Sequence, residues 1–146
     1  MLKIAVVDDE KVYIDQIQEY IRQYSAEKKR EIQTETFCDG SALLENYSPR
    51  FDIILLDIEM GKLNGMETAR EIRKKDQDVV LVFITNMAQY AINGYDVGAL
   101  DYVLKPINYY TFSVRLDRAV SRVKKRQPEE ILLNLPDGIK RLKVDR

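Results

Sequence analysis

The sequence contains no histidine, which excludes histidine-based acid–base catalysis, histidine ligation of metals and an internal phosphohistidine relay. The single cysteine, Cys38, cannot form an internal disulfide bond, so a cytoplasmic location is the default expectation. No apolar run approaches the roughly 18 residues that a membrane-spanning helix requires. The first residues enter a strand-like segment without a signal-peptide pattern, and we therefore expect no membrane partner.

The chain also lacks an excess of charge of either sign. Its formal net charge is −1, which gives no bulk electrostatic footprint for nucleic acid. Charged residues make up 32% and hydrophobic residues 45%, a balance typical of a folded domain rather than a disordered chain. With 146 residues, the chain is long enough for one well-buried domain and a tail, but too short for two ordinary domains.

Residues 51–57, FDIILLD, are the segment around which we expect the fold to be organised. The unbroken aliphatic run Ile53–Leu56 is typical of a central strand that is buried on both faces of a parallel sheet. A carboxylate directly after such a strand is costly unless it lies at the carboxyl edge of the sheet, where open α/β folds place their ligands. Asp57 is therefore predicted to be presented at that edge, where Gly61 and Gly65 turn the chain.

Four further apolar runs are predicted strands, and apolar residues at helical spacing predict five helices. The predicted strands are residues 3–7, 31–37, 79–84 and 101–104; the predicted helices are residues 10–25, 41–47, a segment with Leu63, Met66, Ala69 and Ile72 on one face, 87–94 and 109–123. Asp8 or Asp9 is a candidate N-cap of the first helix. The alternation of strands and helices predicts an α/β fold with a doubly wound, five-stranded parallel sheet, but it does not fix the strand order.

The last twenty residues have a different pattern. Residues 131–135 are apolar, Pro136, Asp137 and Gly138 form a strong turn signal, and residues 139–144 alternate apolar with mostly basic side chains. This pattern predicts a short C-terminal β-hairpin, which is marginally stable by itself in water. We expect the hairpin to begin a second domain whose remainder is absent, after a linker at residues 124–130. An edge hairpin on the main domain is the alternative.

Polar groups follow four of the predicted strands: the pair Asp8 and Asp9, then Asp57, Thr85 and Lys105. Each has an ordinary structural explanation, because aspartates cap helices, threonine favours strands and a lysine before proline is usually on the surface. A doubly wound sheet, however, brings these strand ends into one crevice.

As a single site, these groups have a consistent chemistry. Two carboxylates 4 Å apart repel by about 4 kcal/mol at an effective dielectric of 20. Mg²⁺ relieves such repulsion, prefers oxygen ligands and typically binds one or two carboxylates together with a phosphate. A lysine and a hydroxyl group opposite would receive phosphoryl oxygens. The site would then form an acyl phosphate on a carboxylate nucleophile.

This combination resembles the receiver domain of two-component response regulators, and the resemblance covers residues 2–125. It implies that Asp57 is the phospho-acceptor and that Asp8 and Asp9 are an acidic metal-binding pair. The metal, Mg²⁺ or Mn²⁺, would also contact Asp57 and the backbone carbonyl of Glu59. A receiver takes its phosphoryl group from a sensor histidine kinase and is not a turnover enzyme.

The same resemblance implies a conformational switch and a strand order. Thr85 would be the switch hydroxyl, Lys105 would contact the phosphoryl group, and Tyr102, three residues before that lysine, would be the switch aromatic. Receivers have the strand order 2-1-3-4-5.

The tail resembles the start of a LytTR-type DNA-binding domain. The resemblance therefore divides the chain into a receiver domain, residues 1–126, and a linker with the truncated start of an output domain, residues 127–146. Phosphorylation is expected to pair two receivers through residues 90–98, 101–104 and 109–123, where Tyr90, Tyr95, Tyr109 and Tyr110 lie among charged residues. Alternatively, several of these tyrosines complete the core. DNA would be bound only through the missing domain.

Two positions depart from the commonest receiver pattern. Asn86 replaces a small residue, and Gly61 replaces a frequent proline. Glu59 and Met87 occupy positions at which receivers vary their dephosphorylation rate, so the lifetime of the phosphorylated state is left open.

Three other functions compete with a phosphorylated receiver. An aspartate-based phosphohydrolase generally has a second aspartate two residues after the nucleophile, where this chain has Glu59. A flavodoxin-like cofactor binder needs a phosphate loop rich in Ser, Thr or Gly, where this chain has Asp8, Asp9 and Glu10. The third alternative is a receiver fold that acts as an interaction module without phosphorylation.

Overall fold

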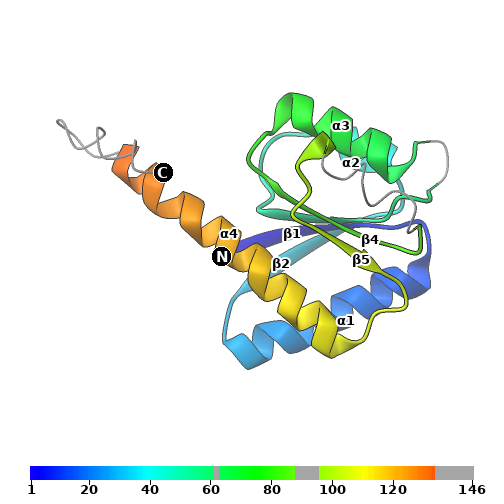
Figure 1. Ribbon diagram of the computed structural model, residues 1–146, viewed down its shortest axis with the longest axis horizontal. Helices are drawn as coiled ribbons and strands as arrows, with labels where there is room; N and C mark the ends of the chain where they lie inside the picture. Colours follow the sequence, from blue (N-terminus) through cyan, green and yellow to red (C-terminus); the bar gives the residue numbers. More distant parts are fainter. Residues whose placement is uncertain (61–62, 88–95, 134–146) are drawn as a thin grey trace.

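The computed structural model of the protein describes residues 1–60, 63–87 and 96–133, with the backbone alone for residues 124–133. Figure 1 shows a central sheet with α1 and α4 on one side and α2 and α3 on the other. The elements are, in chain order, β1 (Leu2–Val7), α1 (Lys11–Lys28), β2 (Ile32–Phe37), α2 (Gly40–Leu44), β3 (Ile53–Leu56), α3 (Gly65–Lys75), β4 (Val80–Thr85), β5 (Asp101–Leu104) and α4 (Tyr109–Leu133).

The sheet has five parallel strands in the order β2-β1-β3-β4-β5, which confirms the predicted fold class and strand order. The register aligns the carboxyl ends of the strands, since Val7 pairs with Leu56 and Thr85 pairs with Leu104. The residues that follow β3 and β5 continue this alignment. The Asp57 N–H donates to the Val7 carbonyl at 3.0 Å, and the Lys105 N–H donates to the Thr85 carbonyl at 2.8 Å. The register therefore carries the four predicted polar features to one edge of the sheet.

Apolar side chains alternate between the two faces of the central strands and form two separate cores. Ile53 and Leu55 join the core beneath α1 and α4, whereas Ile54 and Leu56 join the core beneath α2 and α3. All four side chains of β3 are buried, as the unbroken aliphatic run predicted. Burying one such side chain contributes about 1.5–3 kcal/mol, so β3 is fixed from both sides and holds the residue after it in place.

The start of α3 is fixed against the end of β3. Asn64 and Glu67 form a capping box: each side chain accepts a hydrogen bond from the other residue's backbone N–H. The Gly65 N–H donates to the Ile58 carbonyl at 2.8 Å. A Cβ atom on Gly65 would lie 2.0 Å from the Asp57 carbonyl oxygen, so only glycine permits this approach of the helix to the backbone of Asp57.

The helices differ from the sequence-based expectation at their ends. α1 continues to Lys28, past the predicted end at residue 25, and α2 is shorter than predicted. Neither Asp8 nor Asp9 caps α1, because Glu10 is the N-cap residue and its side chain makes no capping hydrogen bond. Most of the predicted helix at residues 87–94 lies outside the described residues.

The predicted strand from residue 131 is wrong as far as Leu133, because α4 continues through residues 124–133, and the predicted linker at residues 124–130 is helical. Figure 1 shows the second half of α4 extending beyond the sheet. The segment KKRQPEE consists mostly of straight-chain residues with good helix propensity, and extending a helix needs no new nucleation. The helix propensity of this segment outweighs the loss of one backbone hydrogen-bond donor at Pro128. The remainder of the predicted hairpin, residues 134–146, lies outside the described residues.

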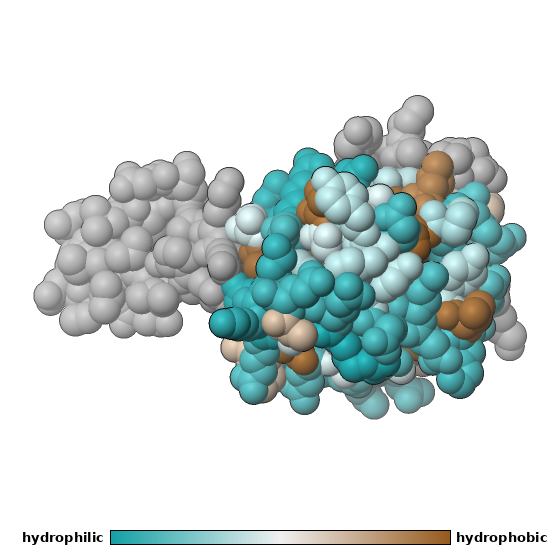
Figure 2. Space-filling view, turned by 90° about the horizontal axis from the view of Figure 1, so that it is seen from below, coloured by the Kyte–Doolittle hydropathy of each residue, from teal (hydrophilic) through white to brown (hydrophobic). Residues whose placement is uncertain are grey.

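Within the described ranges, no helix is both long and apolar enough to cross a membrane. Figure 2 shows the face over α1 and α4 as mostly hydrophilic, with scattered hydrophobic patches.

Candidate functional site

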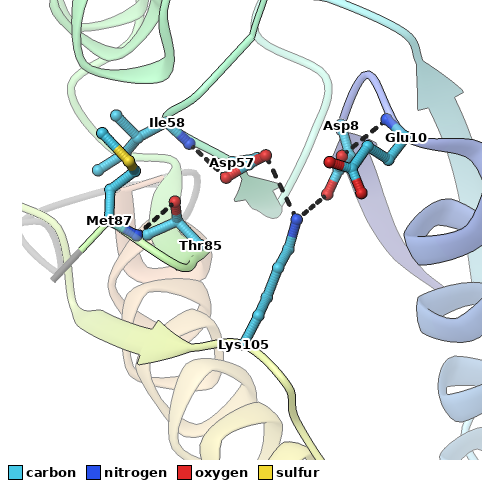
Figure 3. A network of polar contacts seen from close by, with 7 residues as sticks. All are labelled: Asp8, Glu10, Asp57, Ile58, Thr85, Met87 and Lys105. Carbon is cyan, nitrogen blue, oxygen red and sulfur yellow. Dashed lines mark hydrogen bonds and ion pairs between the residues drawn. The ribbon is translucent and has the colours of Figure 1, made fainter.

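Asp57 lies at the carboxyl end of β3 with its side chain almost completely buried, at 4% exposure. One carboxylate oxygen, Oδ1, accepts a hydrogen bond from the Ile58 N–H at 2.8 Å. The other oxygen, Oδ2, lies 3.3 Å from the Lys105 ammonium (Figure 3). Asp57 thus lies at the carboxyl edge of the sheet, as the sequence predicted, and the Ile58 N–H and Lys105 orient its carboxylate.

The Asp8, Asp9 and Asp57 carboxylates converge at this edge. One oxygen atom from each can be chosen so that all three lie within 4.8 Å of one another. Asp8 and Asp57 are buried, whereas Asp9 is exposed. Three carboxylates of which one faces solvent form an oxygen-rich site that fits Mg²⁺ or Mn²⁺, because both ions take carboxylate ligands and Mg²⁺ retains several waters.

Lys105, which follows β5, provides the positive charge of the site. Its ammonium lies 2.7 Å from Asp8 Oδ2 and 3.3 Å from Asp57 Oδ2, and its side chain is 2% exposed. Burial alone would lower the pKa of Lys105, but its hydrogen bond to Asp8 and the charges of Asp57 and Asp8 outweigh this and raise the pKa. The lysine is therefore firmly protonated and bridges the two buried carboxylates.

The pKa of Asp8 is raised, mainly because burial disfavours the carboxylate. The charge of Asp57 raises it further, while hydrogen bonds from Lys105 and from the Glu10 N–H oppose the shift. Among the described residues, three carboxylates meet one ammonium at this site, and this formal surplus of negative charge favours the binding of another cation.

Thr85 and Tyr102 are connected through a single residue, Met87. The Met87 N–H donates to the Thr85 hydroxyl oxygen at 3.2 Å, and the Tyr102 hydroxyl donates to the Met87 carbonyl oxygen. Thr85 is fully buried, and the Tyr102 ring packs on Phe83 with centroids 5.9 Å apart. A displacement of the Thr85 hydroxyl would therefore disturb the segment to which Tyr102 is bonded.

A family model described as "Response regulator receiver domain" matches residues 4–117, which is most of the chain. The chain belongs to the response regulator receiver family. This receiver is thus a phospho-acceptor signalling domain rather than a turnover enzyme, and its family implies a cognate histidine kinase. Its acidic triad is typical of the Mg²⁺ site of receivers.

Curated relatives of this receiver include two kinds of regulatory protein. It is 35% identical to the sensory transduction protein LytT of Bacillus cereus, over 90% of the chain and 50% of the relative. It is 26% identical to the transcriptional regulatory protein BtsR of Escherichia coli, over 98% of the chain and 56% of the relative. The chain therefore spans about half the length of these relatives.

Solved structures support the same family. The non-phosphorylated HemR receiver domain from Leptospira biflexa matches with a TM-score of 0.73 and 27% identity, covering 83% of this chain and 95% of that one. The response regulator TrrA from Thermotoga maritima, in complex with Mg(2+)-BeF, matches with a TM-score of 0.71 and 28% identity, covering 82% and 99%.

The structure brings Asp8, Asp9, Asp57 and Lys105 together, and it places Thr85 at the same edge of the sheet. The side chain of Glu59 is exposed, as is that of Asn86. Gly61 lies outside the described residues.

The predicted pairing face is partly apolar and exposed. Among its tyrosines, Tyr90 and Tyr95 lie outside the described residues, and Tyr110 is 77% exposed. Tyr109 instead packs edge-on against Tyr20, with centroids 5.6 Å apart, and its hydroxyl donates to Glu27. Tyr109 is therefore partly buried against the core, so among the described tyrosines of this face the alternative holds for Tyr109 and not for Tyr110.

Sequence reasoning missed three features that shape the receiver site. Met87 was treated only as a variable position, and Gly65 only as a turn residue, although the first links Thr85 to Tyr102 and the second packs on Asp57. Tyr13 lies within the predicted helix at residues 10–25 and was given no role in the site, but its ring lies against the Lys105 ammonium. The sequence signal for this contact was the position of Tyr13, about one helical turn after the acidic pair.

Proposed function

We propose that this receiver accepts a phosphoryl group on Asp57 from a sensor histidine kinase in a Mg²⁺-dependent reaction. The observation that carries the proposal is the arrangement of Asp57, which is buried, oriented by the Ile58 N–H, and accompanied by two other carboxylates and the Lys105 ammonium. We expect the reaction to take place in the cytoplasm.

In this reaction, an oxygen of the Asp57 carboxylate attacks phosphorus and forms a new O–P bond. The P–N bond of the donor phosphohistidine breaks, and its electron pair stays on the imidazole nitrogen. Asp8, Asp9 and Asp57, with the backbone carbonyl of Glu59, would hold Mg²⁺ or Mn²⁺, which supplies positive charge next to the phosphoryl oxygens. Lys105 supplies a second positive charge, because its ammonium already lies beside Asp57.

We propose that phosphorylation is relayed through Thr85, Met87 and Tyr102. A phosphoryl group offers acceptor oxygens to the Thr85 hydroxyl and Lys105, and the displaced Thr85 would release the Met87 N–H. Conversion from 1% to 99% of the active state requires roughly 5.5 kcal/mol. Two or three charge-assisted hydrogen bonds of about 1.5–3 kcal/mol each approach that value.

We further propose that residues 127–146 contain a linker and the start of a LytTR-type DNA-binding domain, so that DNA is a partner of a longer protein. The similarity to LytT and BtsR, of which the chain spans about half, supports this output. The receivers would pair on phosphorylation through residues 90–98, 101–104 and 109–123. Leu104, Tyr110 and Val114 supply exposed apolar surface there, at 49%, 77% and 46% exposure.

Intact mass after incubation with acetyl phosphate tests the acceptor. Wild type should gain one phosphoryl group with Mg²⁺ present and none after chelation, and Asp57→Asn should gain none. Asp15→Asn is a matched control, because Asp15 is an exposed aspartate on α1 that pairs only with Lys11 among the described residues. Undiminished labelling of Asp57→Asn would disprove the assignment. A wild type that never labels would favour the phosphorylation-independent interaction module.

Sedimentation velocity with and without beryllofluoride tests the pairing of receivers. We expect self-association to increase with beryllofluoride and to be weakened by Val114→Asp. Val12→Asp, which alters an exposed valine on α1 outside the proposed face, should not weaken it. A chain that stays monomeric in both states would contradict the pairing, and specific binding of a duplex by this chain in a DNA shift assay would contradict the output assignment.

A further inference from the structure

The ring of Tyr13 lies against the charged end of Lys105. The Lys105 Nζ atom is 3.8 Å from the ring centroid of Tyr13, which is within the range of a cation–π interaction. Tyr13 is half-buried in the first turn of α1, where its N–H donates to the Glu10 carbonyl at 3.0 Å. Its position is thus set by the same β1–α1 connection that carries Asp8 and Asp9.

The ammonium of Lys105 binds two of the three carboxylates that a cation would need. Its two hydrogen-bond acceptors among the described residues are Asp8 Oδ2 and Asp57 Oδ2, and both carboxylates belong to the candidate metal site. A divalent cation that binds these carboxylates competes with the ammonium for their negative charge. Any contact that stabilises the lysine in its present position therefore weakens the binding of the cation.

Tyr13 makes such a contact. The negative face of an aromatic ring attracts an ammonium group, and the attraction increases when water is excluded; the side chain of Lys105 is only 2% exposed. The ammonium is also closer to Asp8, at 2.7 Å, than to Asp57, at 3.3 Å. Asp8 and Tyr13 both flank the β1–α1 connection, so together they hold the lysine toward the acidic pair.

We propose that Tyr13 is a positioning residue that holds Lys105 on the Asp8 and Asp57 carboxylates and thereby lowers the affinity of the acidic site for a divalent cation. The proposal rests on the metal site of the proposed function. The tyrosine ring, and not its hydroxyl, sets the cation concentration at which the lysine is displaced.

Calorimetric titration of the full chain with Mg²⁺, repeated with Mn²⁺, tests the proposal. Replacing the ring by an aliphatic side chain, in Tyr13→Leu and Tyr13→Met, should tighten cation binding about 5- to 30-fold, the range expected for loss of one partly to fully desolvated cation–π contact. Tyr13→Phe keeps the ring face and should leave the affinity unchanged. A purely structural role would loosen the site, so neither aliphatic variant would then gain affinity.

A double-mutant cycle identifies the lysine as the intermediary. In a Lys105→Met background there is no ammonium for the ring to hold, so adding Tyr13→Leu should no longer change cation affinity. Val12→Leu, on the same helical turn but exposed, controls for changes in α1 and should bind the cation as wild type does. Unchanged or weaker binding by both aliphatic variants, or an equal gain in Tyr13→Phe, would overturn the role of the ring. A wild type that binds neither ion would instead overturn the metal site itself, and the proposal with it.

Discussion

Lys105→Met is predicted to destabilise the metal-free protein by leaving Asp8 and Asp57 without their common counter-charge. The lysine lies 2.7 Å from Asp8, which corresponds to an attraction of ~6 kcal/mol at an effective dielectric of about 20. The two carboxylates that remain have oxygens within 4.8 Å, so they repel by at least ~3.5 kcal/mol under the same assumption. Part of the attraction is offset by the cost of burying the lysine, and removing one partner of such a buried group typically costs about 3–5 kcal/mol.

The loss of stability in Lys105→Met should depend on pH in a defined direction. Burial raises the pKa of Asp8, while its hydrogen bond from Lys105 and the lysine charge oppose that rise. Without the lysine, the pKa of Asp8 rises further, so the folded mutant binds the Asp8 proton more tightly than the unfolded chain does. A group with a raised pKa contributes stability below its unfolded pKa and loses that contribution as the pH rises through the folded pKa. The difference in the free energy of unfolding between wild type and Lys105→Met should therefore become smaller as the pH falls below neutral.

Urea denaturation of wild type and Lys105→Met, at neutral and mildly acidic pH and with chelator or Mg²⁺, measures these effects. Mg²⁺ should stabilise the mutant more than wild type, because the cation replaces the missing charge. Lys74→Met is the control, since Lys74 forms only an exposed pair with Glu71 among the described residues and should lose little stability. A deficit in Lys105→Met that is the same at both pH values and unaffected by Mg²⁺ would show that the lysine acts through packing and not through charge.

Three further predictions concern neighbouring features. Gly65→Ala should cost about 1–3 kcal/mol in denaturation experiments, because its Cβ atom would meet the Asp57 carbonyl oxygen; full stability would contradict the close packing of α3 on β3. Thr85→Ala should still be phosphorylated, as measured by intact mass, but should show little phosphorylation-dependent self-association; a full response would refute the proposed relay through Met87. Tyr24→Phe removes a hydroxyl that donates to Asp117 at 2.6 Å and should lower the free energy of unfolding by about 1 kcal/mol, which urea denaturation measures; an unchanged value would show that this bond is replaced by water.

The local sequence determined most of the strands and helices, because the patterns that specify them lie within short segments. The aliphatic run of β3 requires burial on both faces, and the apolar spacing of α4 places Phe112, Leu116 and Val123 on one buried side. The position of each polar residue directly after a strand was equally visible, and parallel strands bring such positions to one edge. The strand order, in contrast, came from the family resemblance, because no local signal states which strands are neighbours.

The end of the chain shows where local signals conflict. A turn signal at Pro136 to Gly138 and an apolar run before it predicted a hairpin, whereas the helix propensity of the preceding charged segment extended α4 to Leu133. Both tendencies are present in the sequence, and their relative strength depends on the helix that already packs on the sheet and needs no new nucleus.

Tertiary structure alone decided which side chains meet inside the site. The sequence placed Lys105 and Asp57 at the same edge, but only the packed fold shows the ammonium nearer to Asp8 than to Asp57 and covered by the ring of Tyr13. Tyr13 has the same helical spacing as the core residues of α1, so its pattern predicts burial and says nothing of a charged neighbour 92 positions later in the chain. Distances of 3–4 Å between such residues follow from the register of the sheet and the angle at which α1 packs on it, and neither quantity is encoded in any single segment.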